Sequence, residues 1–252
     1  MNKEEGIKTD IMEEAERVWR AADNFGILLR LIGGLAVRVH SESSLLPALA
    51  RNYKDLDFAT QAGNVPRLTN LLKELGYVPD KAFNALNMGR RQLFYETESN
   101  RQLDLFVDTF EMCHTIPLHD RLKVEKMTIP LAELFLSKIQ IIQLNEKDVK
   151  DLFALLLDHK IAAGDKEVIN RDIIAERTAK DWGFFHTIEL NLAKLRLLIN
   201  NYELGEKDGE KILLAIEAIL EVMNRSKKGL NWQMRSKIGE KLMWYKLPEE
   251  VG

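Results

Sequence analysis

The chain has 252 residues, of which 46% are hydrophobic and 30% are charged, so it is neither disordered throughout nor too short for one large or two small domains. The 36 Lys and Arg residues against 39 Asp and Glu residues give a net charge of −3, which excludes a generally basic nucleic-acid binder. The single cysteine, Cys113, excludes an intramolecular disulfide framework and a Cys-rich zinc site.

The first twenty residues, MNKEEGIKTDIMEEAERVWR, are rich in charge and lack the apolar segment of a secretory signal. No run of about 18 apolar residues occurs along the chain, so the sequence predicts no membrane span. We therefore expect a cytoplasmic protein without a membrane partner.

Short strand patterns alternate with turn-forming residues in the first half. Pro66, a following apolar face and Gly76 predict one helix, with proline in the first turn and glycine as the stop. Apolar runs of four to eight residues predict strands at 27–32, 55–58, 92–95 and 102–107.

The second half has almost no strand pattern, and its apolar residues recur at helical spacing. One helix is expected to open at Thr128 to Pro130, another to be capped by Asn145, and a third to run from the Asp181 cap to about Tyr202. Two more helices are predicted near 206–224 and 232–245.

These patterns predict an α+β protein with two domains. Residues 1–129 would form a mixed sheet with flanking helices, and residues 130–252 would form a helical bundle. The pattern places the boundary softly, between Thr128 and Gly164.

A glycine pair, Gly33 and Gly34, follows the first predicted strand and precedes a predicted helix. Glycines there let the backbone approach a ligand closely, and the helix N-terminus offers N–H groups to an anion. When the pair is taken alone, a plain tight turn is the simpler explanation.

Three acidic residues interrupt the predicted strands. Asp55 and Asp57 are two residues apart, so on a strand both would point to one face while Leu56 and Phe58 point to the core. Asp104 interrupts an apolar strand, where a carboxylate is costly to bury without a partner. If the two strands pair, the three carboxylates converge and could hold two divalent ions. A solvated strand face is the alternative for the first two acids taken alone.

The order of a glycine pair, an Asp-x-Asp and a third Asp on a later strand resembles the nucleotidyltransferase superfamily, which has the DNA polymerase β-like fold. The resemblance runs through Ile32-Gly33-Gly34, 55–58 and 102–105. It looks strongest toward stand-alone prokaryotic nucleotidyltransferases of the abortive-infection toxin type. It implies a nucleotidyltransferase-type mixed sheet with flanking helices, followed by a C-terminal helical bundle.

The resemblance also implies a role for each of these residues. Asp55 and Asp57 would bind two Mg²⁺ ions, with Mn²⁺ as an alternative, and Asp104 would bind the ion that activates the acceptor and would take the acceptor proton. Gly33 and Gly34 would hold the phosphates of an NTP through backbone N–H groups. The implied reaction moves an NMP from the NTP to an acceptor and releases pyrophosphate.

Further cationic residues are candidates for binding phosphate. Lys138, followed by Asp148 and Asp151, is similar to an element of the toxin-like branch, and there the resemblance implies that Lys138 contacts the triphosphate. Taken alone, Lys138 reads as a solvated or snorkelling lysine. Arg90 and Arg91 precede a predicted strand, and Arg91 is our nucleotide-binding candidate as a bidentate donor; a solvated turn is the alternative.

Other features have plainer explanations. Residues 35–54 lengthen the spacing between the glycines and Asp55 beyond that usual in the family, and we expect the insert at 40–51 to form a loop or lid. The histidines lack zinc-ligand spacing. The aromatic residues of the second half are expected to pack in the bundle: Trp182, Phe184, Phe185, Trp232, Trp244 and Tyr245.

We expect an NTP as substrate and favour an RNA end or a partner protein as acceptor, with a toxin–antitoxin pair as one setting. Basic residues in the first half support an anionic acceptor: Arg51, Lys54, Arg67, Arg90, Arg91, Arg101, Arg121, Lys123 and Lys126. The alternatives are a small-molecule acceptor such as an aminoglycoside, and a nucleotide-binding module that kept the fold and lost turnover. The helical half is expected to close the acceptor cleft, to form a homodimer, or to do both.

Overall fold

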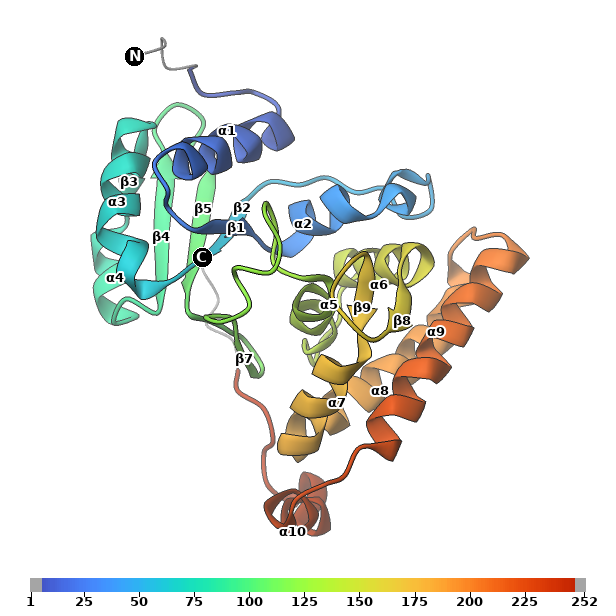
Figure 1. The fold of residues 1–252 in the computed structure, drawn as a ribbon. Coiled ribbons are helices and arrows are strands. Elements are labelled where there is room, and N and C mark those ends of the chain that lie inside the picture. Colours follow the sequence, from blue (N-terminus) through green and yellow to red (C-terminus); the bar gives the residue numbers. More distant parts are fainter. Residues whose placement is uncertain (1–5, 248–252) are drawn as a thin grey trace. The chain divides into compact units, whose positions relative to one another are not determined.

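The computed structural model describes residues 6–247, which form two compact units (Figure 1). The division of the chain into two domains at residues 129 and 130 stays a prediction; the compact units of the structure are not continuous, because two earlier segments cluster with the second unit. The first unit holds the described residues up to Ala36, Asn52–Phe110 and Pro117–Pro130, and the second holds Val37–Arg51, Glu111–Ile116 and the described residues from Leu131.

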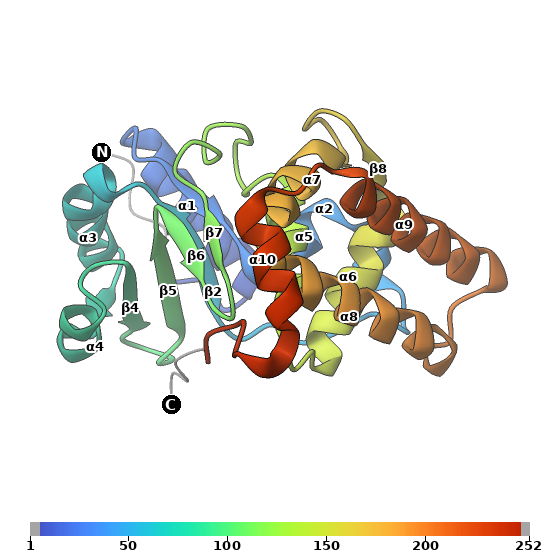
Figure 2. The same ribbon diagram turned by 90° about the horizontal axis from the view of Figure 1, so that it is seen from below.

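A five-stranded mixed sheet forms the centre of the first unit. The outer pairs are antiparallel, whereas the central neighbours β2 and β5 run parallel. The strands β4 and β5 lie side by side in both ribbon views (Figures 1 and 2). In spatial order the strands are β1 (Leu29–Leu31), β2 (Leu56–Thr60), β5 (Gln102–Val107), β4 (Arg91–Glu96) and β3 (Tyr77–Pro79).

The predicted fold class, a mixed sheet with flanking helices followed by a helical part, is confirmed. Helix α3 (Val65–Glu74) begins around Pro66 and is followed by Gly76 at φ +95°, as its sequence signals predict. It packs against β3 and against α1 (Ile11–Asn24). A short helix, α4 (Lys81–Leu86), packs against β4.

Helix α1 is absent from the prediction. The Asp10 side chain caps it by accepting hydrogen bonds from the backbone N–H groups of Met12, at 2.8 Å, and Glu13, at 3.0 Å. Its apolar face consists of small residues, and Ala15, Val18 and Ala22 are fully buried. The signal was therefore in the sequence: an Asp cap followed by apolar residues spaced three and four apart.

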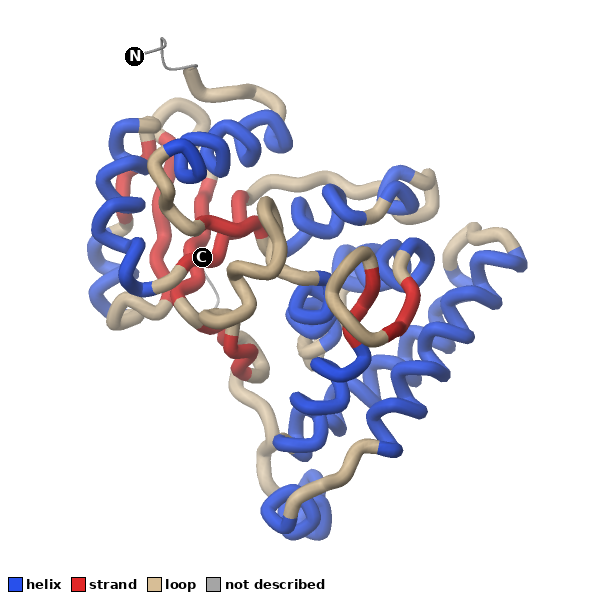
Figure 3. Tube along the Cα trace, in the orientation of Figure 1, coloured by secondary structure: helices blue, strands red, loops and turns tan. Residues whose placement is uncertain are grey.

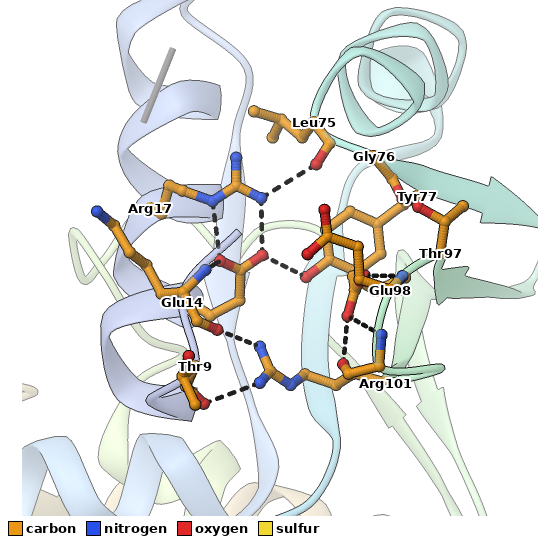
Figure 4. A network of polar contacts seen from close by, with 12 residues as sticks. Thr9, Glu14, Arg17, Leu75, Gly76, Tyr77, Thr97, Glu98 and Arg101 are labelled. Carbon is orange, nitrogen blue, oxygen red and sulfur yellow. Dashed lines mark hydrogen bonds and ion pairs between the residues drawn. The ribbon is translucent and has the colours of Figure 1, made fainter. Parts of the chain in front are cut away.

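A buried polar network joins α1 to the sheet (Figure 4). The Glu14 carboxylate is fully buried and accepts hydrogen bonds from Arg17 Nη2 at 2.7 Å and from the Tyr77 hydroxyl at 2.7 Å. Arg101, at the start of the β5 region, donates to the backbone carbonyls of Lys8 and Thr9, both at 3.0 Å. These bonds fix the segment before α1 against the turn between β4 and β5.

The second unit consists mainly of helices (Figure 3). The Asn145 and Asp181 caps are confirmed, since their side chains accept hydrogen bonds from the backbone N–H groups of Asp148 and Phe184. Its longer helices are α5 (Leu131–Ile139), α6 (Glu146–Asp158), α7 (Arg171–Lys180), α8 (Trp182–Leu198), α9 (Glu206–Arg225) and α10 (Leu230–Ile238).

Three predictions for the second half were wrong in detail. Helix α7 was missed, and so was a short parallel pair, β8 (Lys160–Ala162) and β9 (Val168–Asn170), because three-residue strands carry almost no periodicity. The last helix ends at Ile238, where Gly239 adopts φ +60°. Trp244 therefore lies beyond the helix and packs by donating from Nε1 to Thr187 Oγ1 at 3.1 Å.

The helix predicted after the glycine pair is present, and the insert expected as a loop at 40–51 contains one short helical turn. Helix α2 (Gly33–His40) starts at the glycine pair itself, and a short 3₁₀ turn, Glu42–Leu45, follows it. Within the second unit, Asp158 Oδ2 accepts from the backbone N–H of Ser43 at 2.9 Å. This segment is thus tied to the end of α6.

A hairpin of β6 (Thr109–Glu111) and β7 (Thr115–Pro117) completes the regular structure. Between residues 6 and 247, no helix is both long and apolar enough to cross a membrane.

Candidate functional site

Asp57 and Asp104 lie opposite each other on the parallel strands β2 and β5. The residues on either side of them, Leu56, Phe58 and Leu105, are fully buried, so the core holds the backbone of both strands. Because alternate residues of a strand share a face, the two carboxylates emerge on the face opposite these apolar side chains. The strand pairing on which carboxylate convergence depended is therefore present.

Asp55 lies one residue before β2 begins and is exposed. The predicted strand at 55–58 is thus shifted, and Asp55 belongs to the segment that leads into it. Its charge nevertheless acts on Asp104, as the electrostatics below show. We call Asp55, Asp57 and Asp104 together the carboxylate group.

The glycine pair approaches this group directly. Gly33 adopts φ +72°, and a Cβ added to it would collide with Asp57 Oδ2 and lie 3.1 Å from Asp57 Cγ. The backbone N–H of Ile32 also donates to the Asp57 carbonyl at 3.0 Å. Gly34 is buried in the first turn of α2, where backbone N–H groups have no partner within the helix. Glycine at position 33 is therefore required by both conformation and space.

Arg91 lies against Asp104. Its Nε donates to both carboxylate oxygens of Asp104 at 3.0 Å, and its Nη2 also pairs with Oδ2. The guanidinium lies over the rings of Phe83 and Phe106, 5.5 and 5.2 Å from their centroids. The sequence pattern predicted neither aromatic neighbour, because Phe83 reaches Arg91 from the separate helix α4.

Electrostatics at Asp104 are set by opposing effects. Burial raises the pKa of this carboxyl, the hydrogen bonds and charge of Arg91 lower it, and the Asp55 charge raises it again. The net pKa is raised, so the Arg91 guanidinium alone does not offset burial and the neighbouring acid.

The donor chemistry of the carboxylate group suits a hard divalent cation, because its ligands would be carboxylate oxygens. Asp57 and Asp104 are neighbours, and a close-fitting backbone at Gly33 supports Asp57. Among residues 6–247, no three His, Cys, Asp or Glu side chains are close enough to hold a metal ion as they stand. A cation at Asp104 would have to share or displace the oxygens that Arg91 holds.

Lys138 lies in a second charged cluster, within the second unit. Its Nζ pairs with Asp151 Oδ2 at 2.8 Å and with Asp148 Oδ1 at 3.4 Å. Arg51 also binds Asp151 through two bonds of 2.8 Å. The Lys138 side chain is 14% exposed, so the solvated reading is wrong. Its contact with a triphosphate stays a prediction.

The arrangement of this Lys138 cluster (Arg51, Lys138, Asp148 and Asp151) explains its charge state. Burial lowers the pKa of Lys138, but Asp151 and Asp148 outweigh that effect, and the net pKa is raised. Arg51 was expected among the residues that favour an anionic acceptor; its pairing with Asp151 had no local signal, because the two residues lie 100 positions apart in the chain.

The plainer explanations fit the structure. Trp182, Phe184 and Phe185 are buried in the second unit. His114 is buried beside Phe184, with ring centroids 5.1 Å apart, and its Nε2 lies 2.8 Å from Thr187 Oγ1. The three aromatic residues and His114 therefore contribute to packing within the second unit.

No family model and no curated protein sequence matches the chain. One solved structure similar to it is ANT(2")-Ia in complex with adenylyl-2"-tobramycin. The two chains are 11% identical with a TM-score of 0.40, and the match covers 57% of this chain and 86% of that chain.

Proposed function

We propose that this chain is a metal-dependent nucleotidyltransferase that moves an NMP from an NTP to an acceptor and releases pyrophosphate. The observation that carries the proposal is the pairing of Asp57 with Asp104 across parallel strands, with the Gly33 backbone against Asp57. Folding alone does not require two facing acids at that point of the sheet, because like charges side by side oppose folding. Nor does it require a glycine backbone that fits closely against one of them.

Each residue has a part in this proposal. Asp57 and Asp104 would hold Mg²⁺ or Mn²⁺ together with Asp55, and bound ions would supply activation of the acceptor oxygen and neutralisation of the triphosphate. Asp104 would take the acceptor proton. Gly33 and Gly34 would bind phosphate oxygens through the N–H groups of the first turn of α2.

Two cations have less direct parts. Arg91, once displaced from Asp104, would donate to a phosphate oxygen, for which its guanidinium geometry is suited. Lys138 is proposed to neutralise the leaving pyrophosphate, although two acids of the second unit hold it in the structure. The acceptor class, a toxin–antitoxin setting and a homodimer stay predictions.

The proposal is tested by thermal unfolding with each of the four NTPs, with and without Mg²⁺. An NTP at about 100 times its Kd should stabilise the protein by about 2.7 kcal/mol. The expected result is a Mg²⁺-dependent shift in the wild type that Asp57→Asn loses, together with loss of label transfer from an α-labelled NTP.

Asp120→Asn is the matched control, because Asp120 is an exposed residue of the first unit and its change removes the same charge. It should keep both the shift and the transfer. Transfer at the wild-type rate by Asp57→Asn, or no stabilisation of the wild type by any NTP, would contradict the proposal.

A further inference from the structure

An exposed apolar stripe runs along α10 in the second unit. Leu230, Met234 and Ile238 are four residues apart, so their side chains lie one after another on one face of the helix. They are 77, 66 and 45% exposed, although the apolar face of a helix normally packs on a core. Leu242 and Met243, just beyond the helix, are exposed as well. We call Leu230, Met234 and Ile238 the α10 stripe.

The other face of α10 is fixed within the second unit. Trp232 donates from Nε1 to the Thr178 carbonyl at 3.0 Å, and its ring meets that of Phe185 edge-on, with the centroids 5.3 Å apart. The Arg235 guanidinium lies 4.6 Å from the centroid of the Trp182 ring. The helix packs against α8 through this side (Figure 2). The α10 stripe is therefore held away from the core by ordered contacts on the opposite face.

Three exposed lysines flank the stripe: Lys227, Lys237 and Lys241. Lys237 comes seven residues after Leu230, two turns along the helix, and so lies at the edge of the stripe. Lys227 precedes the helix by three residues, and Lys241 lies in the short 3₁₀ turn that follows it. No hydrogen bond or ion pair holds any of the three in the part of the chain that the structure describes.

The charge of this segment is strongly positive. Between residues 225 and 247 the sequence has one acid, Glu240, which lies 2.8 Å from Nε2 of His186. It has seven cations: Arg225, Lys227, Lys228, Arg235, Lys237, Lys241 and Lys246. Three acids on neighbouring elements are already paired with cations: Glu111 with Lys246, Glu176 with Lys180 and Glu221 with Arg225. The three flanking lysines are thus an excess of positive charge beside an apolar surface.

This combination of residues distinguishes between possible partners. A nucleic acid would meet the lysines with its phosphates but leave the apolar stripe without a partner. A second copy of this chain would bring the same lysines together, and their repulsion would oppose association. Protein interfaces are depleted in Lys and use aromatic and Arg anchors, whereas Trp232 and Arg235 are engaged inside the unit. Exposed aliphatic side chains flanked by lysines are typical of helices that lie on an anionic bilayer.

We infer that α10 docks the second unit onto the surface of an anionic lipid bilayer. The α10 stripe enters the boundary between head groups and acyl chains, and the three lysines contact the lipid phosphates. The nine residues of α10 extend about 14 Å, about half the hydrocarbon thickness of a bilayer, so the helix lies in the surface and does not span it. The expectation of no membrane partner rested on the lack of a spanning segment, which a surface contact does not require. The inference goes beyond the proposed nucleotidyl transfer and does not depend on it.

The first test is co-sedimentation of the full chain with vesicles of phosphatidylcholine and phosphatidylserine, and with vesicles of phosphatidylcholine alone. The wild type should bind the mixed vesicles at least about tenfold more tightly, and added salt should weaken that binding. Changing Lys237 and Lys241 together to Gln should weaken it by about 30-fold, since each lysine near an anionic surface contributes about fivefold. The matched control changes Lys207 and Lys211, two exposed lysines of α9, to Gln and should alter binding by less than about twofold.

The second test addresses the apolar contact. Met234→Gln should weaken binding to the mixed vesicles by about tenfold, because it removes an inserted apolar side chain. Leu214→Gln is the matched control, since Leu214 is 70% exposed on α9 of the same unit, and it should change binding by less than about twofold. All four variants replace exposed side chains and should unfold at the wild-type temperature, which separates loss of docking from loss of the fold.

Three results would overturn the inference. The first is failure of the wild type to bind the mixed vesicles, or equal binding to phosphatidylcholine alone. The second is equal binding by Met234→Gln and Leu214→Gln, which would reduce the contact to general electrostatic attraction. The third is a dimer in analytical ultracentrifugation that Met234→Gln disrupts, without vesicle binding, which would assign the α10 stripe to a second copy of the chain.

Discussion

The Lys138 cluster and the carboxylate group with Arg91 contain similar residues but differ in how their charges are balanced. In the second unit, Lys138 and Arg51 face Asp151 and Asp148, and the net effect raises the pKa of Lys138, so the cationic form is stabilised. In the first unit, Arg91 pairs with Asp104, yet the pKa of Asp104 is raised, so its anionic form is disfavoured. In the Lys138 cluster each acid pairs with a cation, whereas in the carboxylate group our proposal assigns the carboxylates to a further cation. A buried cluster with balanced charges is typical of a structural role, whereas a buried carboxylate with a raised pKa is the feature on which our proposed site rests.

The largest expected loss of unfolding free energy comes from a substitution in the Lys138 cluster. Asp151→Asn leaves Lys138 and Arg51 without their shared carboxylate in a site where Asp151 is 2% exposed, and should cost about 3–5 kcal/mol of unfolding free energy. Asp57→Asn, which makes the same change in the carboxylate group, should cost about 1 kcal/mol or less because it removes one of several like charges. Urea unfolding of both variants checks the contrast. Similar losses would mean that the carboxylate group is also a structural network.

The sequence predicted the parts of the site that have a local signature. Gly33, Gly34 and the alternation around Asp57 and Asp104 are local, whereas the pairing of the two strands was only a condition of the prediction and is seen in the structure. Contacts between separate elements could not be predicted in this way. Arg91 lies over Phe83 and Arg51 pairs with Asp151, and neither contact produces a periodic pattern in the sequence. Strands β8 and β9 were not predicted because three residues are too few to show an alternating pattern.

The glycine contact sharpens the account of the first unit. Gly33→Ala places a methyl group against Asp57 at a φ of +72°, whereas Gly89→Ala imposes a similar backbone conformation, φ +76°, with nothing within 4 Å. The Gly89 variant should lose about 1 kcal/mol from backbone strain alone, and the Gly33 variant about 2–3 kcal/mol, together with its NTP thermal shift. Thermal unfolding of the pair with and without Mg²⁺–NTP makes the comparison. Equal behaviour would show that Gly33 is only a turn residue.

The smallest effect concerns a buried group of the second unit whose described partners are neutral. Burial lowers the pKa of His114 to about 4, against the opposing charge of Asp181, and the imidazole meets the Thr187 hydroxyl. Well above pH 6.5 the ring is neutral in both the folded and the unfolded state, so it adds no pH dependence there. As the pH falls from 6.5 toward 4, His114 becomes protonated in the unfolded chain but stays neutral in the folded chain, so the free energy of unfolding declines. At pH 5 this difference in protonation should lower the free energy of unfolding by about 2 kcal/mol.

The free energy of unfolding should therefore fall by about that much more between pH 7 and pH 5 in the wild type than in His114→Gln. That variant keeps His40 and every carboxylate. If the free energy of unfolding falls equally in the two proteins, the acid sensitivity comes from the carboxylates and not from this histidine. Burial of His114 without an ionic partner would then contribute no measurable pH dependence to stability.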